Sequence, residues 1–246
     1  MKKCPVIFLL LIFIVFGFGC QGNFNTSPIS PGMVQTPTPN SVPPMGIYWK
    51  WADVQHIKDV DVSGTVTRNR FEADIAFSVN HLAEPSAGVT LTGPGFTIPL
   101  PYSGTVSCFN SSVTYTYAEF NAFGITWPYQ PGGVYVLTVN TSIGVASSAV
   151  TAPGGIVISK DGLNANWTVE GDTGGIGVNS PSSVCTYSDS GNLISPFSIP
   201  VSAYSAGSGN YVVTTSCSQT TTNIVNGSGS YFGYFALDTL NSTIYK

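Results

Sequence analysis

Apolar and polar residues alternate along much of the chain from about residue 57 onward. The clearest stretch is 71–80, whose apolar positions are Phe71, Ala73, Ile75, Phe77 and Val79. A period of two places one set of side chains toward a core and the other toward water, as in a half-buried β-strand. Residues 71–80 are therefore predicted to form such a strand.

Further segments of the same kind follow, separated by Gly, Pro, Asn and Ser. They are 135–140, 145–151, 164–169, 211–216 and 230–237. Thr, Val, Tyr and Phe dominate these segments, which is typical of strands. After the first 19 residues, no segment longer than ten residues has helical periodicity. The predicted class is all-β.

Many short strands at this spacing indicate β-sandwiches. About 190 residues make either one large sandwich or two smaller ones. Three features favour two sandwiches. The turn sequence at 152–155 lies in the middle, segments 133–138 and 209–214 are similar, and Cys108 and Cys185 are separated by nearly the same number of residues as these two segments. We predict a duplicated module.

In each similar segment, a tyrosine opens a strand shortly after a glycine, at Tyr135 and at Tyr211. This resembles the tyrosine corner of immunoglobulin-like and fibronectin type III-like domains. The resemblance implies two consecutive antiparallel β-sandwich domains, with expected bounds 46–152 and 153–246. The cysteine–tryptophan–cysteine spacing of antibody domains is missing.

The N-terminus has the features of an export signal. A basic start at Met1–Lys3 precedes an apolar run from Val6 to Phe18. A membrane-spanning helix needs about 20 apolar residues, so this shorter run fits a signal peptide, here residues 1–19.

The signal ends in Gly19-Cys20, which resembles the lipobox of bacterial lipoproteins. The resemblance implies lipidation of Cys20 with fatty acyl chains, and therefore a membrane as one partner. Gly17 stands where that family usually has leucine, and Gly17 with Gly19 also fits ordinary signal peptidase. The alternative is thus a freely secreted protein beginning at Cys20. Gln21 after the cysteine is compatible with an outer-membrane or cell-surface location.

Residues 20–45 form a predicted disordered tether between the lipid and the folded part. They contain six prolines: Pro28, Pro31, Pro37, Pro39, Pro43 and Pro44. Such a segment cannot bury a core and is expected to be semi-extended.

Charge is scarce: 8% of residues are charged, with 12 acidic and 8 basic side chains. Ordinary soluble domains have roughly 25%. A net charge of −4 argues against nucleic acid as a partner, since nucleic-acid binders carry a basic surface. Few acid–base residues are available for catalysis. The sequence predicts a non-enzymatic protein without a cofactor.

Three cysteines lie in the predicted domains. Cys185 and Cys217 are the only pair within one domain and are candidates for a disulfide, which would close a loop of about 30 residues and add roughly 3 kcal/mol in the chain-entropy model. The alternative is buried thiols, Cys108 included. The chain has no Cys-x-x-Cys, and no metal site is predicted.

Two motifs resemble known sites but fit turns or strands better. Asp172-Thr173-Gly174 and Asp189-Ser190-Gly191 match the aspartic-protease triplet but lie too close together for two lobes, so turns are expected. Residues 59–64 match the first half of an EF-hand loop, but Arg70 occupies its twelfth position, so a strand is expected.

Aromatic residues provide the only indication of a binding site. One cluster comprises Tyr48, Trp49 and Trp51, and the other contains Trp127 and Tyr129. Exposed rings stack on sugars or anchor protein interfaces, whereas buried rings close the ends of a sandwich.

The predicted function is therefore non-catalytic: adhesion, scaffolding or ligand presentation to a protein or glycan partner. One alternative is carbohydrate binding through Trp127 and Tyr129. The other is a hydrolase with a carboxylate pair among Glu72, Glu84, Glu119 and Glu170, which the sequence does not single out.

Overall fold

The computed structural model describes residues 46–246 except 111–112, 170–172 and 226–229. The signal peptide, the tether and Cys20 therefore lie outside the described residues. In the described part the chain forms strands and one short 3-10 helix, η1 (Val201–Tyr204). The all-β prediction is confirmed.

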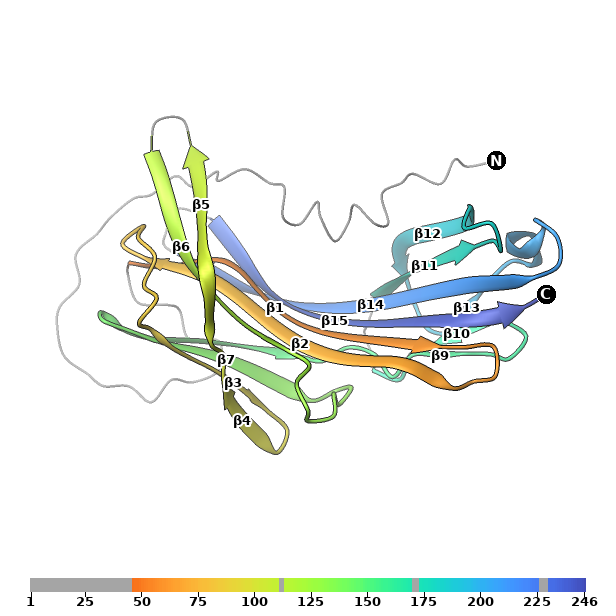
Figure 1. The fold of residues 1–246 in the computed structure, drawn as a ribbon, viewed down its shortest axis with the longest axis horizontal. Helices are drawn as coiled ribbons and strands as arrows, with labels where there is room; N and C mark the ends of the chain where they lie inside the picture. The colour runs from red at the N-terminus through yellow and green to blue at the C-terminus, as the bar shows by residue number, and fades with distance from the viewer. Residues whose placement is uncertain (1–45, 111–112, 170–172, 226–229) are drawn as a thin grey trace.

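A central sheet of eight strands has the order β12-β11-β14-β15-β1-β2-β6-β5 (Figure 1). The bounds of its strands are β1 Ile47–Val60, β2 Val66–Val79, β5 Tyr102–Asn110, β6 Val113–Phe123, β11 Thr173–Asn179, β12 Cys185–Leu193, β14 Asn210–Val225 and β15 Ser230–Tyr245. Neighbouring strands are antiparallel except β1 and β15, which are parallel. The longest strands, β14 and β15, run most of the length of the molecule.

Two smaller sheets complete the fold. One has the order β4-β3-β7-β8 and the other β13-β10-β9. Their bounds are β3 Gly88–Gly93, β4 Phe96–Pro99, β7 Val134–Thr141, β8 Gly144–Thr151, β9 Val157–Ile158, β10 Asn164–Asn166 and β13 Phe197–Ser198. Figure 1 shows them toward opposite ends of the long central strands.

The first core lies between the central sheet and β3, β4, β7 and β8. The alternating apolar positions predicted in 71–80 all face it, at 0–8% exposure. Leu91, Leu137 and Val139 cover them from the smaller sheet, and Tyr234 and Ala236 of β15 join the same core.

The second core lies at the other end of the central sheet. Ile176 and Val178 of β11, Tyr211 and Val213 of β14, and Trp167 after β10 are buried together there. Tyr211 pairs with Ile244 in β15, and alternation along that strand places Ile244 on the same face as Tyr234. Both cores therefore lie on one face of the central sheet. We call the opposite face the outer face.

The two cores do not follow the predicted domain division strictly, because Tyr234 and Ala236 of the second predicted domain lie in the first core and the central sheet passes through both cores. β15, from the second half of the chain, pairs with β1 over Ala52–Val60. The boundary between 46–152 and 153–246 stays a prediction.

The two tyrosines of the similar segments have comparable surroundings. Both are fully buried. The Tyr211 hydroxyl donates to the Gly207 carbonyl, four residues upstream, at 2.8 Å. The Tyr135 hydroxyl accepts from the backbone N–H of Gln130, five residues upstream, at 3.0 Å. Each tyrosine therefore fixes the chain that leads into its strand.

The turn expected at 189–191 is wrong, whereas part of the strand expected at 59–64 is present. Asp189-Ser190-Gly191 lies inside β12 and is not a turn, because Asp189 pairs with Ile176. Asp59 and Val60 end β1 as expected, and the Asp61 carboxylate then caps the turn by accepting from the N–H groups of Ser63 and Thr65. Asp172 lies outside the described residues.

Candidate functional site

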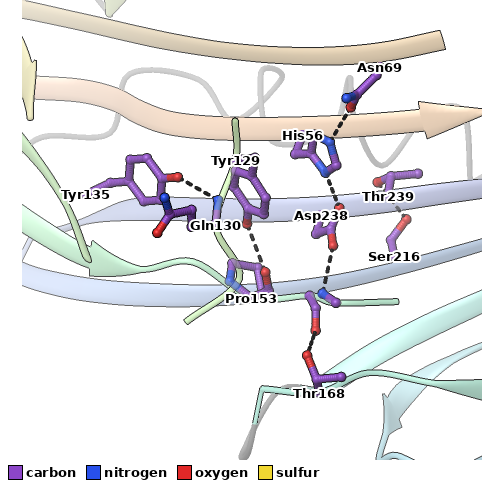
Figure 2. A network of polar contacts seen from close by, with 12 residues as sticks. His56, Asn69, Tyr129, Gln130, Tyr135, Pro153, Thr168, Ser216, Asp238 and Thr239 are labelled. Atoms are coloured by element: carbon purple, nitrogen blue, oxygen red, sulfur yellow. Dashed lines mark hydrogen bonds and ion pairs between the residues drawn. The ribbon is translucent and has the colours of Figure 1, made fainter. Parts of the chain in front are cut away.

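A polar network joins the two ends of the molecule beside the linker at Ala152–Gly155 (Figure 2). Asp238 of β15 accepts at Oδ2 from the Gly155 N–H at 3.2 Å. Its other oxygen lies 2.7 Å from His56 Nδ1 of β1. Thr168, beyond the linker, donates its hydroxyl to the Gly154 carbonyl at 3.3 Å. We call this network the joint.

The two glycines of the linker are required by this geometry. Gly154 has φ +114°, and an added Cβ would lie 1.9 Å from Asp238 Oδ2. Gly155 has φ +70°, and its Cβ would lie 1.9 Å from the Thr168 hydroxyl. The Gly-Gly sequence that indicated a boundary is therefore where the backbone passes closely over the central sheet.

His56 and Asp238 resemble two members of a hydrolytic triad, but the third position is different. His56 Nε2 lies 2.6 Å from the Asn69 side-chain oxygen, and the ring stacks on Tyr129 at 4.7 Å between centroids. The side chains of His56 and Asp238 are only 14% and 7% exposed. His56 Nε2 thus contacts an amide oxygen where a triad would have a hydroxyl or thiol, and the His56–Asp238 pair positions the linker.

The structure separates the two candidate binding aromatics. The Tyr129 hydroxyl donates to the Pro153 carbonyl at 3.0 Å, and its ring stacks on His56 and Tyr135. Tyr129 is therefore part of the joint, as in the burial alternative.

Trp127, two residues earlier, is 44% exposed. Its ring stacks on Phe96 at 5.3 Å between centroids, and buried Phe96 meets Phe71 edge-on. Trp127 is thus an exposed indole that rests on the first core through one aromatic contact.

We call the end of the central sheet that bears the first core the first end, and the other the second end. The outer face at the first end carries a group of carboxylates. Asp53 of β1 stands opposite Asp74 of β2, and alternation adds Glu72 of β2 and Glu119 of β6. Asp53 accepts from the Gln55 amide at 3.1 Å, and Asp74 Oδ2 accepts from the Trp51 indole at 3.0 Å. Asp74 Oδ1 is buried without a hydrogen-bond partner among the described residues.

Burial changes the acidity of this pair. Desolvation, followed by the charge of Asp74, raises the pKa of Asp53 to about 7. Desolvation, followed by the charge of Glu119, raises the pKa of Asp74 to about 6. Two carboxyl groups that hold protons near neutral pH are chemically suited to acid–base work.

The sequence did not single out this pair. Of the glutamates it considered, Glu72 and Glu119 join the outer face, whereas Glu84 accepts from the Ser142 N–H at 2.8 Å and Glu170 lies outside the described residues. The alternation of Glu72 and Asp74 with apolar residues was visible, but the pairing of β1 with β2 supplies Asp53.

A β-bulge adds a lysine to the same face. The register between β1 and β2 shifts between Trp49 and Trp51, so Trp49 is buried in the first core while Trp51 lies on the outer face. Lys50 is the extra residue, and bulges of this kind re-aim side chains. Its amine contacts Cys108 Sγ of β5 and lies 5.4 Å and 5.3 Å from the ring centres of Trp51 and Tyr117.

The expected Cys185–Cys217 disulfide is wrong for this structure. β12 and β14 lie on either side of β11, where Asn179 pairs with both Cys185 and Val212. Cys217 is five residues beyond Val212, so the two cysteines are about 10 Å apart across the strands and about 17 Å apart along them. A disulfide needs Cα atoms within about 7 Å. Strand β11, inserted between the two, could not be placed from the sequence.

The described part of the chain lacks both a metal-binding cluster and a membrane-spanning helix. No group of three or more His, Cys, Asp or Glu side chains in this part of the chain could hold a metal ion. The same residues include no helix with the length and apolarity needed to cross a membrane.

Comparison with known proteins adds little. No protein-family model matches the sequence, and no curated protein matches it. Among solved structures, the chain is similar to one described as "Biofilm associated protein - BSP domain", with 14% identity and a TM-score of 0.21. The match covers 78% of this chain but only 29% of that chain. A likeness at this level carries no argument about function.

Proposed function

We propose that the chain is an exported, lipid-anchored surface protein whose β-sandwiches bind a partner without catalysis. The observation that carries the proposal is Trp127, 44% exposed and held on Phe96. An indole fixed in this way presents a flat apolar surface without further ordering. Aromatic residues of this kind are enriched at the centres of binding sites.

A glycan is the ligand class that this surface fits best. One ring face of Trp127 is covered by Phe96, and a half-exposed indole stacked in this way offers the other face to a sugar ring. In this proposal Tyr129 does not touch the ligand. Its hydrogen bond to the Pro153 carbonyl fixes the segment that carries Trp127. The proposal therefore assigns contact to Trp127 and positioning to Tyr129.

The test is glycan-array binding by the purified protein and its Trp127→Ala variant. We expect the variant to lose at least tenfold in binding while its thermal unfolding stays close to that of the parent. The matched control is Tyr245→Ala, since Tyr245 is 66% exposed at the end of β15 that bears the second core. Unchanged glycan binding in Trp127→Ala would overturn the assignment.

The lipid anchor is tested separately at Cys20. Cells that express the protein are fed a labelled fatty acid, and the protein is recovered from the membrane fraction. We expect Cys20→Ser to lose the label and to be released. Label that persists in this variant refutes the anchor but leaves the ligand site untouched.

The Asp53–Asp74 pair favours one other function, hydrolysis by an acid–base pair. The pair is tested with a panel of chromogenic glycosides and esters. Turnover that disappears in both Asp53→Asn and Asp74→Asn would replace binding by catalysis as the primary function.

A further inference from the structure

Lys50 and Cys108 meet although their strands are not neighbours. β2 and β6 separate β1 from β5 in the order of the central sheet. The Lys50 amine nevertheless contacts Cys108 Sγ on the outer face. Because an extended lysine side chain is shorter than three strand spacings, this contact requires the sheet to curve here and bring β5 toward β1 on the outer face.

Several features hold the amine at this position. The bulge between Trp49 and Trp51 directs Lys50 to the outer face. The rings of Trp51 and Tyr117 lie within cation–π distance of its nitrogen. The ion pairs among the described residues involve His56, Arg68 and Arg70, so no carboxylate competes with the thiol for Lys50.

The thiol is available for reaction. Cys108 is a free cysteine and only half-buried. It lies on β5, the edge strand of the central sheet, opposite Tyr115 of β6. A small oxidant can therefore reach its sulfur, whereas Cys217 is 1% exposed inside the second core.

We propose that oxidation of Cys108 produces a reversible covalent cross-link between Lys50 Nζ and Cys108 Sγ. Hydrogen peroxide first converts the thiol to a sulfenic acid and releases one water. The Lys50 ammonium gives one proton to solvent water, and the resulting amine attacks the sulfur: the N–S bond forms, the S–O bond breaks, and the departing oxygen leaves as water with a second proton from the nitrogen. Overall, peroxide is reduced to two waters, the amine and thiol lose two hydrogens, and the proton of the ammonium passes to solvent.

A small thiol reverses the reaction. It attacks the sulfur, returns the amine to Lys50 and leaves a mixed disulfide, and a second thiol then restores Cys108. The link would fasten the edge strand β5 to β1 across the face that carries Asp53 and Asp74. It would also protect the cysteine from irreversible oxidation to the sulfinic and sulfonic acids.

The experiment treats the purified full chain with peroxide, blocks remaining thiols and maps tryptic peptides by mass spectrometry. We expect a peptide containing Lys50 joined to one containing Cys108, lighter by two hydrogens than their sum and uncleaved after Lys50. Dithiothreitol should separate the two. Lys58, on the same strand, serves as the internal control and should stay cleavable.

The Lys50→Arg variant keeps a positive charge between the rings but cannot make the link. Dimedone, which traps sulfenic acids, should label Cys108 at least fivefold more in Lys50→Arg than in the parent. Two results together would overturn the proposal. The parent yields no joined peptide after peroxide, and its Cys108 is labelled by dimedone or oxidised to the sulfonic acid as readily as in Lys50→Arg. Since the joined peptide is sought in the unchanged sequence, a variant that folds poorly does not affect the outcome.

Discussion

The two ends of the central sheet have different outer faces. At the first end this face holds Lys50, Asp53 and Asp74, largely withdrawn from water. At the second end it holds neutral pairs between β14 and β15, such as Thr214 with Asn241 at 2.7 Å and Ser216 with Thr239 at 3.0 Å. Cross-strand pairs of that kind hold strands together without changing charge. Charge is also present beside these pairs, because Asn241 donates to Asp59 at 2.8 Å and Asp59 forms an ion pair with Arg68 at 2.9 Å. The two ends therefore differ in that the carboxyl groups with raised pKa values, Asp53 and Asp74, lie at the end that bears the first core.

The largest expected effect comes from separating the two ends at the joint. Gly154→Ala should lower the free energy of unfolding by about 4 kcal/mol, because its Cβ would meet Asp238 and φ is +114°. Gly207→Ala is the control: its φ is +103°, but nothing lies within 4 Å, so a loss of about 1 kcal/mol is expected. Urea unfolding measures both. Equal losses would show that the joint does not couple the ends.

A cavity in the second core tests whether that end supports the first. Ile176→Ala should lower the free energy of unfolding by about 3 kcal/mol, since Ile176 is fully buried. Because β14 and β15 run through both ends, amide hydrogen exchange should become faster in β2 as well as in β11. Faster exchange confined to β11 and β12 would mean that the two ends open separately.

The carboxylates of the first end predict an unusual pH dependence. The pKa of Asp53 is about 7 in the folded chain, against 3.8 for an ordinary aspartate. Between these values the unfolded chain gives up the proton while the folded chain keeps it, so stability is greatest in acid and falls as pH rises toward 7. Asp53→Asn should remove the part of this fall that Asp53 causes and be more stable than the parent by about 2 kcal/mol at pH 8, while Asp74, whose pKa is raised to about 6, still causes the smaller remaining fall.

Asp161, near the second core, provides the contrasting case. The hydrogen bond from Ser159 is the main cause that lowers its pKa. Removing this carboxylate should give no stabilisation in alkali, and thermal unfolding of Asp161→Asn across the pH range measures this. If Asp53→Asn and Asp161→Asn respond alike, burial is not what distinguishes the outer face of the first end.

The smallest expected effect concerns a single hydrogen bond in the joint. Tyr129→Phe keeps the stack on His56 and removes the bond to the Pro153 carbonyl, so a loss of about 1 kcal/mol is expected. Glycan binding by Trp127 should weaken only slightly. A loss of binding as large as that in Trp127→Ala would make Tyr129 a contact residue.

The sequence predicted what depends on local alternation. The apolar positions of 71–80 reveal their buried face without reference to any other strand, and Tyr135 and Tyr211 mark their strands in the same way. It could not predict the bulge at Lys50, since period two would place Trp49 and Trp51 on the same face. Nor could it place Asp53 opposite Asp74, because strand pairing depends on the whole sheet.

The parallel pairing of β1 with β15 has a consequence for how the protein acquires its structure. His56 and Asp238, which meet across this pair, are 182 residues apart in sequence. Contacts of such long range slow folding, because a large loop must close before they form. A chain that emerges N-terminus first therefore leaves one edge of β1 open until β15 has followed. The native sheet is completed only after β15 has emerged, and until then the exposed edge of β1 is the part most liable to pair with another chain.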